Sequence, residues 1–160
     1  MICELFSVPA DSARQVLDDP SDVHDLLQSL EEAGAIISLE KSWQGLHFAL
    51  TGSAWGGEPP LNFLAAGGEP VGDEDVGYGP ARILDPDQVD VLNSALVGVT
   101  EAEFARRFDL AELAREDVYP QIWDEPLEDL LEEYRGYLAQ AKALIGQASR
   151  EGHALLIVIR

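Results

Sequence analysis

The chain has a single cysteine, few basic residues and no long hydrophobic run, and each shortage excludes a class of protein. With one cysteine, Cys3, the chain can form neither an internal disulfide nor a cysteine-rich zinc site. A single free cysteine is typical of proteins from a reducing compartment. The longest apolar run, residues 154–159, is far shorter than the roughly 20 residues that a membrane helix needs. The start Met1-Ile2-Cys3-Glu4 lacks the basic region of a signal peptide. We therefore expect a cytoplasmic protein that does not bind membranes.

Basic residues are the second shortage. The sequence contains 10 Lys and Arg against 30 Asp and Glu, which gives a net charge of −20. Such a surface repels phosphate backbones and anionic lipids, so we expect no nucleic acid partner. Two interpretations of the charge stay open. Either the charge gives a solvated, self-repelling surface that keeps the protein soluble, or it forms a docking face for a basic protein.

Recognisable catalytic and metal-binding motifs are missing as well. The glycines around Ser53 do not have the spacing of a nucleophile elbow, and Gly77-Tyr78-Gly79 lacks the third glycine of a dinucleotide fingerprint. No lysine follows a glycine loop in the manner of a phosphate-binding loop, and no acidic run has the pattern of a calcium loop. The three histidines, at positions 24, 47 and 153, form no HxH or HExxH pair. We expect no metal, no cofactor and no identifiable catalytic residue.

What is present favours one α+β domain over residues 1–160. A chain of this length with 46% hydrophobic residues buries enough surface to fold alone. Residues 2–8 are expected to form a strand that Pro9 ends, and residues 154–159 a buried strand after Gly152. Two terminal strands around a helical middle predict a small mixed sheet packed against several helices.

The clearest predicted element is a long helix over about residues 126–150. Its apolar residues recur in steps of four and three, and a strict heptad of this kind is compatible with a coiled coil. The stripe has three apolar positions per heptad, which is wider than a coiled-coil seam. This width favours packing of the helix on the domain's own sheet.

Shorter helices are predicted between the terminal elements. After Pro9, Asp11 or Ser12 is expected to cap one helix, and residues 20–22 open another that ends at Gly34. The spacing of residues 39–50 is helical, with Gly52 as the stop. Further helices are expected after Asp85-Pro86, over 100–108 behind a capping box, and after Asp109. In the glycine- and proline-rich segment 52–80, only residues 61–66 are expected to form a helical turn. This segment is either functional or a surface detour.

The block from Trp43 to Gly52, with its Trp-x-x-x-His-Phe-x-Leu-Thr-Gly pattern, resembles the YfbM-like family of bacterial proteins of unknown function. Further matches follow in the same order, and they are Ile2-Cys3, Gly79-Pro80-Ala81-Arg82, Arg107-Phe108-Asp109, Val118-Tyr119-Pro120 with Trp123, and Gly152-His153-Ala154-Leu155. The resemblance covers nearly the whole chain and implies a bacterial α+β domain. It implies no reaction, substrate or catalytic residue.

Six residues are the candidates for ligand binding: Trp43, His47, Tyr78, Arg82, Tyr119 and Trp123. Trp43 and His47 are expected on one helix face, and Tyr119 and Trp123 in a break between helices, where side chains often line clefts. Tryptophan is the largest core residue, so packing is the competing explanation. His47 is either a core histidine with a backbone partner or a ligand-binding or acid–base residue.

Three hypotheses about function follow. The favoured one is a non-enzymatic acidic binding protein, antitoxin- or immunity-like, that meets a basic protein partner by electrostatic attraction. The alternative is a small ligand-binding domain or enzyme with a cleft around His47, Tyr119 and Trp123, in which Arg82 or Tyr119 orients an anionic or aromatic ligand. The third is a mainly structural oligomer that associates through the long helix. We expect a monomer or a weak homodimer.

Overall fold

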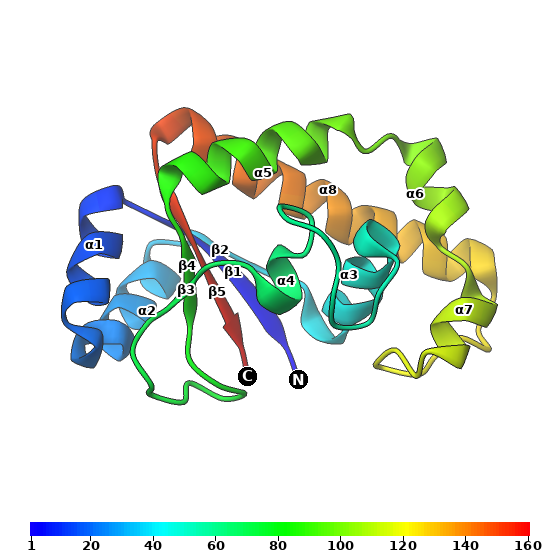
Figure 1. The fold of residues 1–160 in the computed structure, drawn as a ribbon, viewed down its shortest axis with the longest axis horizontal. Coiled ribbons are helices and arrows are strands. Elements are labelled where there is room, and N and C mark those ends of the chain that lie inside the picture. Colours follow the sequence, from blue (N-terminus) through cyan, green and yellow to red (C-terminus); the bar gives the residue numbers. More distant parts are fainter.

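A five-stranded antiparallel sheet organises the computed structural model, which describes residues 1–160 (Figure 1). Its strands are β1 (Cys3–Val8), β2 (Ile36–Ser38), β3 (Glu69–Pro70), β4 (Arg82–Leu84) and β5 (Ala154–Ile159), in the order β2-β1-β5-β4-β3. The two terminal strands pair along their whole length at the centre, from Cys3 opposite Ile159 to Val8 opposite Ala154. Both strands are almost fully buried because helices cover both faces of the sheet.

The α+β class, the terminal strands and the long C-terminal helix are as predicted. The expectation of a mixed sheet was wrong, since all four strand pairings are antiparallel. Strand direction depends on how distant segments cross over, which residue periodicity does not encode. The sequence also gave no signal for β2, β3 and β4, because strands of two or three residues are too short to show alternation.

One face of the sheet is covered by α1 (Ala10–Asp18), η1 (Pro20–Asp22) and α2 (Val23–Glu32). Here a cluster of 13 buried apolar residues joins Phe6 and Leu156 of the sheet to Val16 and Leu27 of the helices. The predicted cap of α1 was wrong, because its N-cap is Pro9 and no side chain caps it. The side chain that does cap in this region belongs to Asp19, which accepts a hydrogen bond at the start of η1.

The other face carries a larger layer of 28 buried apolar residues. It is built from η2 (Glu40–Ser42), α3 (Trp43–Thr51), α4 (Phe63–Ala66), α5 (Pro86–Gly98), α6 (Glu101–Arg107), α7 (Leu110–Arg115) and α8 (Leu127–Glu151). Helix α8 runs behind α3 and beside α5, with α6 and α7 beyond its N-terminal half (Figure 1). Its buried stripe, including Tyr134 and Ile145, belongs to the same cluster as Leu155 of β5. The helix therefore packs within its own domain, as the wide stripe indicated.

The ends of the helices follow the local signals. Thr100 and Glu103 form the predicted capping box, and Asp85 and Asp109 cap α5 and α7 as expected. Gln88 completes a second capping box with Asp85. Gly52 and Gly152 end α3 and α8 in the left-handed conformation, at φ values of 74° and 65°. None of the helices, α8 included, combines the length and the apolar character needed to cross a bilayer.

Candidate functional site

Helix α3 and the residue before it carry three of the four buried polar residues of the molecule. Gln44 and His47 lie within the helix, Ser42 occupies its N-cap position and donates to Glu133 at 3.2 Å, and all three side chains are buried. Burying polar groups costs free energy unless they find hydrogen-bond partners, so their partners identify what the helix does. Those partners are mostly backbone groups of two loops.

Gln44 joins these two loops. Its Nε2 donates to the carbonyl of Ala54 at 3.0 Å, and its Oε1 accepts from the backbone amide of Tyr119 at 2.9 Å. One buried amide side chain thus satisfies an acceptor in the 53–57 loop and a donor in the loop between α7 and α8. Nothing in the sequence pattern pointed to Gln44, because its partner at position 119 is far along the chain.

His47 holds the same 53–57 loop one turn further on. Its Nε2 lies 2.9 Å from the carbonyl oxygen of Gly56, which requires that nitrogen to be the protonated donor. The side chain is fully buried, and burial lowers the pKa of His47 below its ordinary value. The neutral ring leaves Nδ1 as an acceptor without a partner. His47 therefore lies in the core with a backbone partner.

An aromatic cluster surrounds this helix. Trp43 is fully buried and packs edge-on against Trp55 at 5.8 Å between ring centroids. Trp123 donates from Nε1 to the carbonyl of Val118 at 2.6 Å and packs against Tyr134. Gly45 permits this arrangement, because a Cβ at that position would come within 2.6 Å of both the Trp123 and Tyr134 rings. The candidate residues Trp43 and Trp123 are thus both buried and packed against other aromatic rings.

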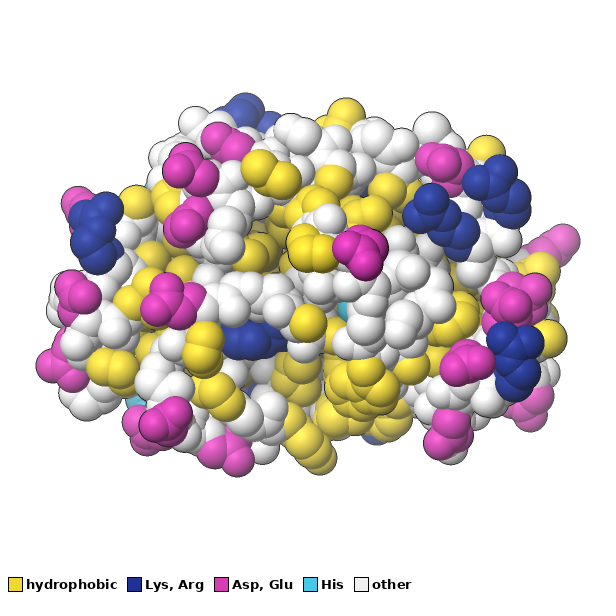
Figure 2. Space-filling view, in the orientation of Figure 1, with side chains coloured by type: hydrophobic (Ala, Val, Ile, Leu, Met, Phe, Trp, Pro, Cys, Tyr) yellow, Lys and Arg dark blue, Asp and Glu magenta, His cyan; other side chains and the backbone are white.

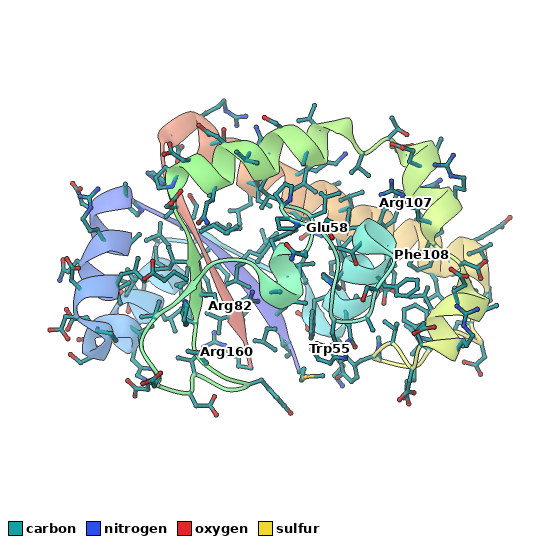
Figure 3. The ribbon with its side chains drawn as sticks, in the orientation of Figure 1. Trp55, Glu58, Arg82, Arg107, Phe108 and Arg160 are labelled. Atoms are coloured by element: carbon teal, nitrogen blue, oxygen red, sulfur yellow. The ribbon has the colours of Figure 1, made fainter.

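Arg82 fixes the short helix α4 from the neighbouring strand. Its guanidinium donates to the carbonyls of Phe63 at 3.1 Å, Leu64 at 2.6 Å and Gly67 at 2.5 Å. No carboxylate pairs with it, and burial lowers its pKa. Figure 3 shows the side chain beside α4. Arg82 therefore directs three hydrogen bonds to backbone carbonyls in and beside α4.

The six predicted residues do not line one open cleft. Trp43, His47, Tyr119 and Trp123 are brought together around α3, but three of these four side chains are buried. Tyr78 lies elsewhere, with 63% of its surface exposed and its amide bonded to Ile159 at the end of β5.

No other reactive centre stands out. Cys3 is fully buried, and burial raises the pKa of its thiol to about 12, so little thiolate is present at neutral pH. His24 contacts Glu74 at 3.1 Å on the surface, and His153 contacts Ser7 at 2.9 Å. Nowhere do three His, Cys, Asp or Glu side chains converge in a way that would hold a metal ion.

An open concave site, called the groove below, lies beside α4, between residues 59–68 and the first half of α5. Its volume is about 510 Å³. Phe63, Leu84 and Leu92 form an apolar floor, and Asp85 and Asp87 stand at the rim. Sequence reasoning missed this groove. The one available signal was the glycine- and proline-rich segment 52–80, which was expected to be either functional or a surface detour. About half of the residues that line the groove come from this segment.

Comparisons with known proteins agree with the fold. The chain is similar to a solved structure described as a protein of unknown function, YfbM, from Escherichia coli, with 22% sequence identity, a TM-score of 0.79 and coverage of both whole chains. A comparison with curated proteins found no match. The family described as "Domain of unknown function (DUF1877)" matches residues 1–158, in line with the resemblance inferred from the block around Trp43. Because this match covers almost the whole chain, the chain belongs to the DUF1877 family, whose description assigns no activity.

Proposed function

We propose that this protein is a non-enzymatic interaction protein, antitoxin- or immunity-like, which binds a basic protein partner. The observation that carries the proposal is the exposure of its negative charge. Of the 30 acidic residues, all except Glu4, Asp22 and Glu103 are exposed. A surface of this kind accelerates encounter with a positively charged partner and disfavours negatively charged ones.

The few cations do little to compensate this charge. Arg82 and Lys142 bind backbone carbonyls, and Lys142 donates to Val99 at 2.7 Å. Arg115 is the only cation between residues 109 and 133, a stretch that includes α7 and the start of α8. The exposed acids of that stretch are Asp109, Glu112, Glu116, Asp117, Asp124, Glu125, Glu128, Asp129, Glu132 and Glu133. Figure 2 shows acidic side chains over the visible face, most of them toward its two ends, where a few Lys and Arg side chains also lie.

The alternative of a ligand-binding or catalytic cleft around His47 has less support. A general acid or base must come within hydrogen-bond distance of its substrate. The 53–57 loop covers His47, whose Nε2 is already bonded to Gly56. Access to His47 would require that loop to open.

The proposal is tested by capturing partners from a lysate of the source organism at low salt and again at high salt. We expect a basic protein that is retained at low salt and released at high salt, because exposed charges are screened within about 8 Å at physiological ionic strength. A partner that is acidic, or one whose retention does not change with salt, contradicts the proposal.

Two matched variants then test whether the charge itself matters. Asp124→Asn, Glu125→Gln and Glu132→Gln neutralise three exposed acids near α8, while Asp18→Asn, Asp25→Asn and Asp73→Asn neutralise three at the opposite end. None of these six side chains forms an ion pair. If the whole field steers association, both triple variants slow binding of the captured partner at low salt. Unchanged association rates in both variants would rule out electrostatic steering.

A further inference from the structure

We propose that the groove between residues 59–68 and α5 receives a segment of the partner in which a lysine or arginine flanks a large apolar side chain. This inference rests on the proposed function and assigns the docking place of the basic partner. The groove's volume of about 510 Å³ lies within the range of sites that enclose a ligand.

The floor and one wall of the groove are apolar. Phe63, Leu84 and Leu92 are buried beneath it, and Pro59 and Pro60 form part of the opposite wall. Val91 contributes to the α5 wall with 58% of its surface exposed, one of the few large hydrophobic residues that the fold leaves in water. Figure 2 shows hydrophobic side chains in the hollow between α5 and α4. An apolar side chain placed here would bury surface that α5 now exposes.

The charge around the groove determines what can accompany that side chain. Asp85 and Asp87 are the charged residues of the lining, which contains no Lys or Arg. Asp85 uses one carboxylate oxygen to cap α5, and Asp87 takes part in no ion pair or side-chain hydrogen bond. A cation beside the apolar side chain therefore finds carboxylate oxygens, whereas an anion meets repulsion.

The walls are held in place without a ligand. Arg82 fixes three carbonyls of the α4 segment, and Gly68 lies so close to β4 that a Cβ there would be 2.9 Å from the Ile83 oxygen. On the other side, Asp90 of α5 accepts a 2.6 Å hydrogen bond from Ser149 of α8. A preformed site lowers the ordering cost of binding. Arg82 acts here as a positioning residue, since it shapes the wall from behind.

The probe that tests this inference is an amidated peptide, Gly-Lys-Trp-Lys-Gly, titrated into the whole isotope-labelled chain and followed by NMR. We expect saturable shifts of the amides of Gly67, Gly68 and Val91. The peptides Gly-Glu-Trp-Glu-Gly and Gly-Lys-Ser-Lys-Gly remove the charge match and the apolar side chain in turn. Both are expected to bind more weakly at these amides.

Two pairs of variants locate the site. Val91→Arg puts a like charge into the groove and is expected to weaken binding by about tenfold. Val97→Arg makes the same change at a 72% exposed position of the same helix outside the groove, and is expected to change affinity by less than about twofold. Asp87→Asn is expected to weaken binding by about threefold. The matched control is Asp129→Asn, which removes the same charge far from the groove and is expected to weaken binding less.

Equal effects of Val91→Arg and Val97→Arg, or shifts spread over the acidic surface without saturation, would overturn the groove as a docking site. The captured basic partner separates this failure from failure of the proposed function. If the partner binds Val91→Arg as tightly as the wild type, the groove inference is wrong while the acidic interaction protein stands. If no basic partner is captured at all, the proposed function itself is wrong.

Discussion

The two faces of the sheet bury different kinds of residue. On the α1–α2 face, a cluster of 13 apolar side chains fills the space, and short turns connect the helices to the strands. On the α3–α8 face, 28 apolar side chains are accompanied by the buried polar residues Ser42, Gln44 and His47. Both faces support long loops, residues 71–81 on the first and residues 52–62 and 116–126 on the second. The amides of Val71, Val76 and Tyr78 in the first loop bond to backbone carbonyls, whereas buried side chains anchor the loops of the second face.

This difference between the two faces explains why α3 carries buried polar side chains. A loop packed against a core needs partners for its backbone donors and acceptors. Gln44 and His47 supply them for Ala54, Gly56 and Tyr119. Of the residues that looked most like a reactive site in the sequence, His47 thus anchors a loop. The predictions below test this contrast between an apolar face and a loop-anchoring face.

The largest expected effect lies on the apolar face. Leu27→Ala removes a side chain that is only 4% exposed and should lower the free energy of unfolding by about 3 kcal/mol. Denaturant titration measures this change. Hydrogen exchange of residues 53–57 should change only as much as global stability does, because Leu27 belongs to the cluster on the other face of the sheet. If hydrogen exchange of residues 53–57 accelerated more than global stability explains, the two faces would not be independent in the way proposed.

On the loop-anchoring face, Gly45→Ala tests the close approach of the aromatic cluster. The added Cβ would lie 2.6 Å from Trp123 and Tyr134, so we expect a loss of about 2 kcal/mol from overpacking. Gly136→Ala is the matched control, since its Cβ would meet nothing within 4 Å. The control should be neutral or stabilising by up to about 1 kcal/mol, as expected in an exposed helix. Equal melting behaviour of the two variants would contradict the tight packing at Gly45.

Gln44→Ala should cost about 1–2 kcal/mol, because it leaves a carbonyl and an amide of two loops without their partner. Its signature is local. Hydrogen exchange should accelerate together in residues 53–57 and 118–121, which are distant in sequence. Gln140→Ala, at an exposed position of α8, is the control and should leave both loops unchanged. Loosening of one loop without the other would show that Gln44 does not couple them.

The smallest expected effect is a pH dependence from His47. Its pKa is lowered from 6.5 in the folded protein by burial, so the unfolded chain binds a proton more readily. The stabilisation is thus fully present above about pH 6.5 and is lost as the pH falls below that value. His47→Gln keeps a donor for Gly56 but cannot titrate. Unfolding measured between pH 7 and 5 should show a weaker pH dependence in the variant, and identical slopes would refute a buried neutral His47.

Part of the candidate site was readable from the sequence. The four-residue spacing of Trp43 and His47 predicted that they lie on the same face of a helix, on successive turns, and both are in α3. Their burial was not readable, because it depends on Trp55 and Gly56 returning over the helix from the loop that follows it. The groove was missed for the same reason, since Phe63 and Val91 meet only after β4 has paired with β5.

The sequence by itself determined the features that a few neighbouring residues control. The caps at Asp85, Thr100 and Asp109, the stops at Gly52 and Gly152, and the stripe of α8 all follow from local hydrogen bonding and periodicity. Tertiary structure alone decided the antiparallel sheet order, the partners of Gln44 and the existence of the groove. Each of these depends on contacts between segments that lie tens of residues apart, and no local pattern specifies which distant backbone group a buried side chain will meet.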